Sequence, residues 1–178
     1  EFRRVLFRSL QQSKRAMESK ADFSDMTPTI VKMPVFESFY IRNKGYNSNI
    51  KETWQKLQTW ILTNNITNYK QIALFHDNPT ITPLNDCQYI GCVVVDNPQK
   101  VKSDRLPNFK ISDGVYAKFD LKGKTGDVLP FIHWVYHEWL PKSEYETTTK
   151  PSYAIYEKLD ILDESDEFEL SFYVSINF

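Results

Sequence analysis

Two histidines stand at a spacing that can do metal chemistry. His133 and His137 are four residues apart in a segment with helical periodicity, which puts both imidazoles on one face. Zinc hydrolases use this spacing, but they also need a glutamate directly after the first histidine as general base. That position holds Trp134, and no cluster of cysteine, histidine or carboxylate completes a site. We therefore expect ordinary helix histidines, with no metal and no cofactor.

The two cysteines carry no expected chemistry either. Cys87 and Cys92 are five residues apart in a predicted strand, so their side chains point to opposite faces and cannot form a local disulfide. Reduced thiols are typical of a cytoplasmic protein. The sequence has no signal peptide and no apolar run of membrane-spanning length. These features predict a cytoplasmic protein without a membrane segment.

Composition narrows the possible partners. The chain is 41% hydrophobic and 15% aromatic, with a net charge of −1. That charge gives no basic field for phosphates, so these residues alone are a poor nucleic-acid binder. The aromatic excess instead favours a small hydrophobic or aromatic ligand.

The elements that must position such a ligand occur twice. Apolar periodicity and turn residues predict strand, helix, strand, strand over residues 31–42, 50–61, 72–75 and 89–95, and again over 115–121, 128–140, 152–156 and 168–178. Seven positions keep a small or apolar residue when the number is raised by 78. They are Phe39, Ile41, Gly45, Ile50, Trp54, Leu57 and Ile61, matched by Ala117, Phe119, Gly123, Val128, Ile132, Val135 and Trp139.

The first residues do not belong to this pattern. Residues 1–9, Glu-Phe-Arg-Arg-Val-Leu-Phe-Arg-Ser, are similar to the translation of a common sequencing adapter and are treated as a scar. Residues 10–26 read as a polar linker remnant. One domain is expected over residues 27–178, with halves of about 27–96 and 109–178.

Several segments resemble one family. His-Asp-Asn-Pro-Thr-Ile-Thr-Pro at 76–83, with Cys-Gln-Tyr at 87–89 and Cys-Val-Val-Val at 92–95, is similar to a segment of the GyrI-like, or AraC effector-binding, domains. The resemblance continues in Gly-Val-Tyr-Ala at 114–117, Trp-Leu-Pro-Lys-Ser-Glu-Tyr-Glu at 139–146 and Pro-Ser-Tyr at 151–153. It covers essentially residues 27–178.

The resemblance implies an α+β fold. Two strand-helix-strand-strand modules with antiparallel sheets would be related by a pseudo-twofold axis, with a ligand groove between the halves. It further implies the effector-binding part of a bacterial AraC-type transcription regulator, contacting DNA only through a missing N-terminal helix-turn-helix part. Stand-alone hydrolases of reactive small molecules and gyrase-inhibiting protein-interaction modules are the alternatives in the same family.

One departure from the family pattern decides which ligand to expect. The ligand-anchoring or catalytic glutamate of the family would fall at position 154, where this chain has Ala154. Alanine can neither pair with a cation nor act as a base, so a neutral or apolar ligand is expected, and an enzyme is not favoured. Glu138, four residues after Trp134 on a helical stripe, is a candidate replacement for that acid.

Strand parity supplies the remaining candidates. Ser38 and Tyr40 share a strand face, Tyr116 occupies the matching face in the second half, and Tyr156 and Tyr173 follow by the same argument. The predicted ligand-binding residues are Ser38, Tyr40, Tyr116, Trp134, Glu138, Ala154, Tyr156 and Tyr173.

Overall fold

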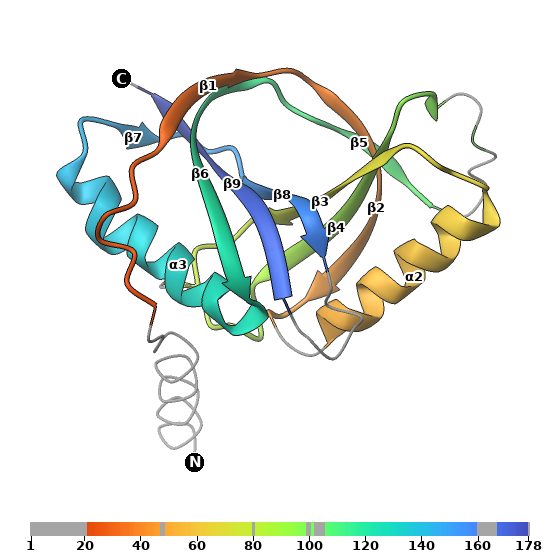
Figure 1. The fold of residues 1–178 in the computed structure, drawn as a ribbon, viewed down its shortest axis with the longest axis horizontal. Coiled ribbons are helices and arrows are strands. Elements are labelled where there is room, and N and C mark those ends of the chain that lie inside the picture. Colours follow the sequence, from red (N-terminus) through yellow and green to blue (C-terminus); the bar gives the residue numbers. More distant parts are fainter. Residues whose placement is uncertain are drawn as a thin grey trace, which may run out of the picture.

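One antiparallel sheet forms the body of the protein (Figure 1). The computed structural model describes residues 21–46, 49–79, 81–98, 101, 106–159 and 167–177. The strands are β1 (Thr29–Met33), β2 (Phe36–Lys44), β3 (Tyr69–Phe75), β4 (Gln88–Val95), β5 (Asn108–Ile111), β6 (Gly114–Lys124), β7 (Glu146–Thr147), β8 (Ser152–Leu159) and β9 (Glu167–Asn177). They pair in the order β1-β6-β9-β8-β3-β4-β2-β5, and β7 pairs with β9.

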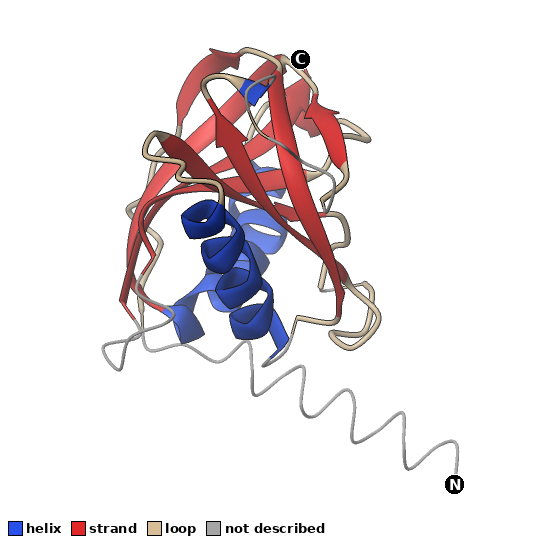
Figure 2. Ribbon diagram, turned by 90° about the vertical axis from the view of Figure 1, so that its right-hand side faces the viewer, coloured by secondary structure: helices blue, strands red, loops and turns tan. Residues whose placement is uncertain are grey.

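Each half contains one helical segment that connects its strands. The first is α2 (Asn49–Thr63), and the second runs from η2 (Thr125–Asp127) through α3 (Val128–Trp134) and η3 (Val135–Trp139) to η4 (Leu140–Lys142). Figure 2 shows the helices together on one side of the sheet. No helix in the described part of the chain is both long and apolar enough to span a membrane.

The predicted duplication holds at the level of strand register. Met33 pairs with Gly114 between β1 and β6, and the same pair shifted by 78 residues, Ile111 with Phe36, joins β5 to β2. At the centre, β3 and β8 pair with each other, with Ala73 opposite Ala154. The pseudo-twofold axis of the predicted fold therefore passes through the two alanines.

The first strand of each half pairs with a strand of the other half. The sequence predicted one strand over 31–42, and that prediction was wrong, because Pro34 and Val35 separate β1 from β2. Proline donates no backbone hydrogen bond and interrupts a ladder. The chain turns there, so β1 pairs with β6 and β2 with β4 and β5. The counterpart β5 was not predicted, because it lies at the end of a polar connector.

The two sheet faces carry separate hydrophobic clusters. The helix-facing cluster contains alternate strand residues such as Phe39, Val93 and Phe172, together with Trp54 of α2 and Phe131 of α3. Phe168, Leu170, Phe172, Val174 and Ile176 of β9 all belong to this cluster.

The cluster on the other face joins strands from both ends of the sheet. Its central members include Leu74 and Tyr153, and its outer members include Val31 of β1 and Ile111 of β5. Strands that stand at opposite ends of the pairing order can meet in one cluster only if the sheet curls. Figure 1 shows β1 and β5 arching over this face.

The second helical segment departs from the predicted helix 128–140. The α-helix ends at Trp134 and continues as a π-helical turn, in which the Leu140 amide donates to the Val135 carbonyl. Pro141 follows, and its missing amide hydrogen prevents a regular end. Asp127 stands at the N-cap without a capping hydrogen bond, since its carboxylate accepts from the Lys124 amide at 3.0 Å.

Both cysteines are free, as expected, and the structure buries both of them. Burial raises the pKa of the Cys87 thiol to about 12.

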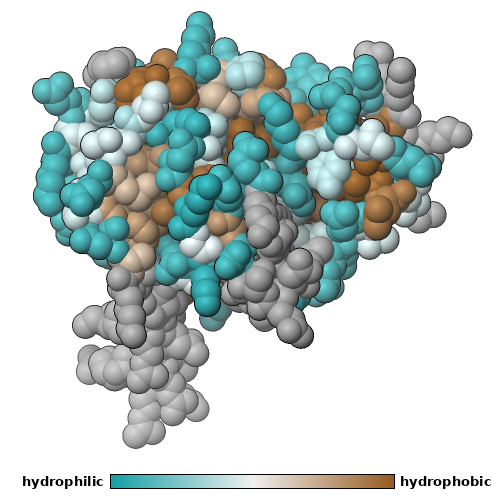
Figure 3. All heavy atoms as spheres, in the orientation of Figure 1, coloured by the Kyte–Doolittle hydropathy of each residue, from teal (hydrophilic) through white to brown (hydrophobic). Residues whose placement is uncertain are grey.

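The exterior in Figure 3 is largely hydrophilic with scattered apolar groups.

Candidate functional site

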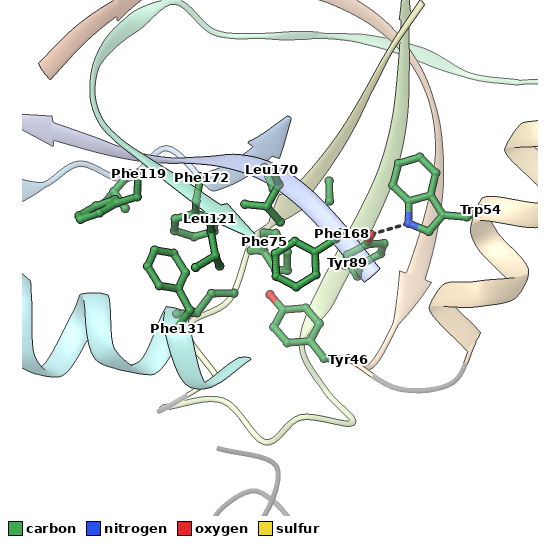
Figure 4. Packing of buried hydrophobic residues seen from close by; sticks show 14 of the residues in the cluster. Tyr46, Trp54, Phe75, Tyr89, Phe119, Leu121, Phe131, Phe168, Leu170 and Phe172 are labelled. Carbon is green, nitrogen blue, oxygen red and sulfur yellow. Dashed lines mark hydrogen bonds between the residues drawn. The ribbon is translucent and has the colours of Figure 1, made fainter. Parts of the chain in front are cut away.

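The candidate site is the helix-facing surface of the sheet around Ala73 and Ala154, which we call the interhelical site. Both alanines are fully buried, and Ala154 lies opposite Ala73 on one side and Phe172 on the other. Aromatic rings surround them: the Phe172 ring lies 5.8 Å from Phe75 and 5.5 Å from Phe131. Figure 4 shows these rings between α3 and α2.

One side of the interhelical site is polar. The Trp54 Nε1–H of α2 donates to the Tyr89 hydroxyl at 2.8 Å, as Figure 4 shows. The Tyr156 side chain lies beside this pair, and its ring meets Trp54 edge-on at 5.7 Å. Burial raises the pKa of Tyr156 to about 12 and that of Tyr89 well above its ordinary value. Both phenols are therefore neutral hydrogen-bonding groups.

Two further tyrosines border the same surface. The Tyr46 hydroxyl donates to the Asp77 carbonyl at 2.9 Å, and its ring lies 5.6 Å from Phe75. Tyr136 of η3 shares a hydrogen bond with the Ser152 hydroxyl at the start of β8. Burial raises the pKa of both tyrosines. The named side chains of the site thus offer rings, hydroxyls and one indole N–H, and none of them is charged at neutral pH.

The polarity differs between the two halves. By the pseudo-twofold relation, Trp54 corresponds to Ile132, and Tyr89 to Leu170. At these two positions, hydrogen-bonding side chains of the first half are matched by aliphatic side chains in the second. A ligand lying across the axis would therefore meet Trp54 and Tyr89 on one side of it and Ile132 and Leu170 on the other.

The structure brings only part of the predicted residue set to this surface. Ala154 and Tyr156 lie in the interhelical site. Tyr116 and Tyr173 belong to the cluster on the opposite face, where their rings are 6.4 Å apart. Ser38 and Tyr40 lie on that face too: Ser38 Oγ donates to the Phe109 carbonyl at 3.2 Å, and the Tyr40 ring meets Phe109 at 4.9 Å.

Trp134 and Glu138 lie at a third place. They line a hollow of about 230 Å³ together with Ser24 and Met26, which lie in the segment before β1. Glu138 is exposed and pairs with Lys142 at 2.8 Å, and this partner lowers the pKa of its carboxyl. The glutamate therefore lies in solvent beside Lys142, whereas Ala154 is fully buried.

The two histidines stack on each other. The rings of His133 and His137 are 4.4 Å apart. In the described ranges, no group of three or more potential metal ligands occurs.

Sequence reasoning missed Trp54, Tyr89, Tyr46 and Tyr136 as site residues. Trp54 and Tyr89 were assigned to a helix stripe and to a strand, but their hydrogen bond joins residues 35 positions apart. The available signal was parity: Tyr89, Val93 and Val95 share one face of β4, the face covered by α2.

The comparison with protein families decides what this arrangement belongs to. The model of the GyrI-like small molecule binding domain matches residues 26–176. The chain belongs to the GyrI-like family. No curated protein matches it.

Solved structures of this GyrI-like domain's fold come from several proteins. The EcmrR C-terminal domain superposes with a TM-score of 0.66 at 15% identity, covering 86% of this chain and 98% of that one. EcmrR bound to DNA gives 0.68 at 16%, covering 97% of this chain but 63% of the EcmrR chain.

Two further proteins share the fold. SAV2435 bound to tetraphenylphosphonium gives a TM-score of 0.60 at 12% identity, covering 85% of this chain and 94% of that one. A hydrolase of Listeria innocua encoded by lin2189 gives 0.60 at 9%, covering 87% and 95%. At these identities the likeness concerns the fold alone.

Proposed function

We propose that this GyrI-like domain binds a neutral, largely aromatic small molecule at the interhelical site. The observation that carries the proposal is Ala154, which stands at the family glutamate position among neutral phenols and apolar rings. A cation there would lose its hydration without gaining an opposite charge. A neutral ligand with one polar end would meet the Trp54–Tyr89 hydrogen bond and the Tyr156 hydroxyl at one side and aliphatic groups at the other.

We further propose that the domain acts as the effector-binding part of a cytoplasmic AraC-type transcription regulator. Support comes from the fold shared with EcmrR, which has been solved on DNA and whose chain extends beyond the matched region. DNA contact would come from a helix-turn-helix part preceding residue 10. The test is to clone the intact gene: its 5′ end should encode two such motifs, and the ligand should change the affinity of the whole protein for its own promoter DNA.

A hydrolase function is disfavoured by the same groups. A general base works best when its pKa lies near the operating pH, and burial keeps Tyr89 and Tyr156 protonated. The likeness to the Listeria innocua hydrolase concerns the fold.

Two ligands with the same three phenyl rings test the proposal. Triphenylphosphine oxide is neutral with one polar end, and methyltriphenylphosphonium is cationic. The wild-type domain should prefer the oxide by calorimetric titration. At 100 times its dissociation constant, the oxide should stabilise the fold by about 2.7 kcal/mol.

Ala154→Glu should reverse that preference. A carboxylate at this position should raise phosphonium affinity about tenfold, because pairing the two opposite charges then contributes about 1.4 kcal/mol. Ala154→Gln is the control of equal size, and it should not raise phosphonium affinity. A wild-type domain that binds the phosphonium as well as the oxide, or binds neither, would contradict the proposal.

A further inference from the structure

A second pocket lies on the sheet face opposite α2 and α3. Its volume is about 210 Å³. Apolar walls come from Leu74 of β3, Phe109 and Ile111 of β5, Tyr116 of β6, and Pro151 before β8. The residues His76, Lys110, Ser112 and Lys150 complete the lining. We call it the curl pocket, because its walls come from strands that meet only where the sheet curls.

The curl pocket is separate from the interhelical site. Leu74 lines the pocket, while its neighbours Ala73 and Phe75 face the helices. Successive strand residues point to opposite faces, so the thickness of the sheet separates the two sites. A ligand in the curl pocket would not touch Trp54 or Tyr156.

The pocket is suited in size and lining to one aromatic ring. An apolar cavity of about 150 Å³ can admit benzene, so the curl pocket has room for a ring with a substituent. The rings of Tyr116 and Phe109 are held by neighbours: Tyr116 lies 5.1 Å from Tyr153, and Phe109 lies 4.9 Å from Tyr40. Preset aromatic walls of this kind favour a flat, apolar ligand body.

The mouth of the pocket offers positive charge. Lys150 Nζ donates to the Asp113 carbonyl, and none of the ion pairs found among the described residues involves Lys150. Lys110 lies at the same mouth and pairs with Glu37 at 3.4 Å. The ammonium of Lys150 can therefore bind an anionic group of a ligand without breaking an ion pair among these residues.

A buried polar group lies next to the pocket wall. Within the described ranges, the Tyr153 hydroxyl is the one buried side-chain polar atom without a hydrogen-bond partner. Tyr153 lies opposite Leu74 in the β3–β8 ladder and beside Tyr116. Unpaired buried hydroxyls are rare and call for an explanation.

We propose that the curl pocket is a second ligand site, which binds a small aromatic carboxylic acid. The ring of the acid would lie against Tyr116 and Phe109, and its carboxylate would pair with Lys150. This assignment is independent of the ligand at the interhelical site.

The test compares 4-hydroxybenzoate with its neutral analogue 4-hydroxybenzamide. Titration is followed by NMR of ring-labelled tyrosines, with the Trp54 indole N–H resonance reporting on the interhelical site. We expect 4-hydroxybenzoate to shift the Tyr116 ring resonances and to leave the Trp54 resonance unchanged.

Variants of two exposed lysines supply the control. Lys150→Gln should weaken 4-hydroxybenzoate binding about threefold to fivefold and leave 4-hydroxybenzamide binding unchanged, as for loss of one exposed charge pair. Lys122→Gln, at an exposed lysine paired with Glu169, should change neither. The proposal is overturned if 4-hydroxybenzoate does not bind, if it shifts Trp54 instead of Tyr116, or if Lys150→Gln binds it as well as the wild type does.

Discussion

At the scale of single residues, two buried tyrosines differ in what their hydroxyls do. Tyr89 accepts the Trp54 indole N–H, whereas Tyr153 has no hydrogen-bond partner among the described residues. We expect Tyr89→Phe to lower the free energy of unfolding by about 1–3 kcal/mol, because it leaves a buried donor unpaired. Tyr153→Phe should lower it by less than about 0.5 kcal/mol or raise it, because it removes an unpaired hydroxyl. Urea denaturation of both variants measures the difference, and equal losses would contradict it.

The sequence could predict some site residues and not others. Ala154 was found because a family motif fixes its position, and Tyr156 follows by parity. Alternation along one strand shows which of its side chains share a face. It does not show which face of the neighbouring strand lies on the same side of the sheet, because a shift of one residue in register moves every side chain to the other face. Ser38, Tyr40, Tyr116 and Tyr173 were for this reason grouped with Ala154, although they lie on the opposite face.

At the scale of elements, Gly91 sets the approach of α2 to the sheet. A Cβ added there would lie 2.9 Å from Leu57 Cδ1 and 3.0 Å from Thr53 Cγ2. Gly91→Val should therefore lower the free energy of unfolding by about 1–3 kcal/mol through overpacking. Gly126→Val is the control, because a Cβ at Gly126 meets nothing within 4 Å. Thermal and urea unfolding compare the two, and a larger loss for Gly126→Val would refute this packing argument.

Element prediction succeeded where one period persists. α2 carries a stripe over four turns and was placed within two residues of its bounds. The predicted end of the second helix was wrong. The π-turn arises from local hydrogen bonding near Pro141, and no hydrophobic periodicity marks it in the sequence. β5 was missed, because four residues beside a polar connector carry too little alternation.

At the scale of the molecule, the exchange of first strands predicts how the halves behave when separated. A chain cut between residues 101 and 102 should give two fragments, neither of which unfolds cooperatively alone. Each would lack partners for its outer strands and for the β3–β8 ladder. Mixing them should restore a cooperative transition by circular dichroism. A second fragment carrying Ala154→Pro should not restore it, because proline cannot donate in a central strand. A fragment that folds alone would contradict this expectation.

Two histidines make the stability of the whole domain depend on pH. Burial lowers the pKa of His76 and of His133 below the usual 6.5, helped by Arg42 and His137 respectively. The folded state therefore binds fewer protons than the unfolded state just below pH 6.5, so stability is complete above that pH and decreases as pH falls toward the folded-state values. Urea unfolding between about pH 5 and 8 measures the slope. The double variant His76→Gln and His133→Gln should flatten it, and an unchanged slope would contradict the assignment.

The exchanged strands also determine how the molecule can move. If the halves separated like jaws, they would break three ladders at once, β1 with β6, β2 with β5, and β3 with β8. We therefore expect the sheet to stay closed between its halves. The interhelical rings would then become accessible only on the side of the sheet that the helices cover. α2 packs on β2 and β4 of its own half, while the second helical segment contains the π-turn. We therefore expect ligand access to depend on lifting or sliding of the helices over a stationary sheet, with α3 as the more movable of the two.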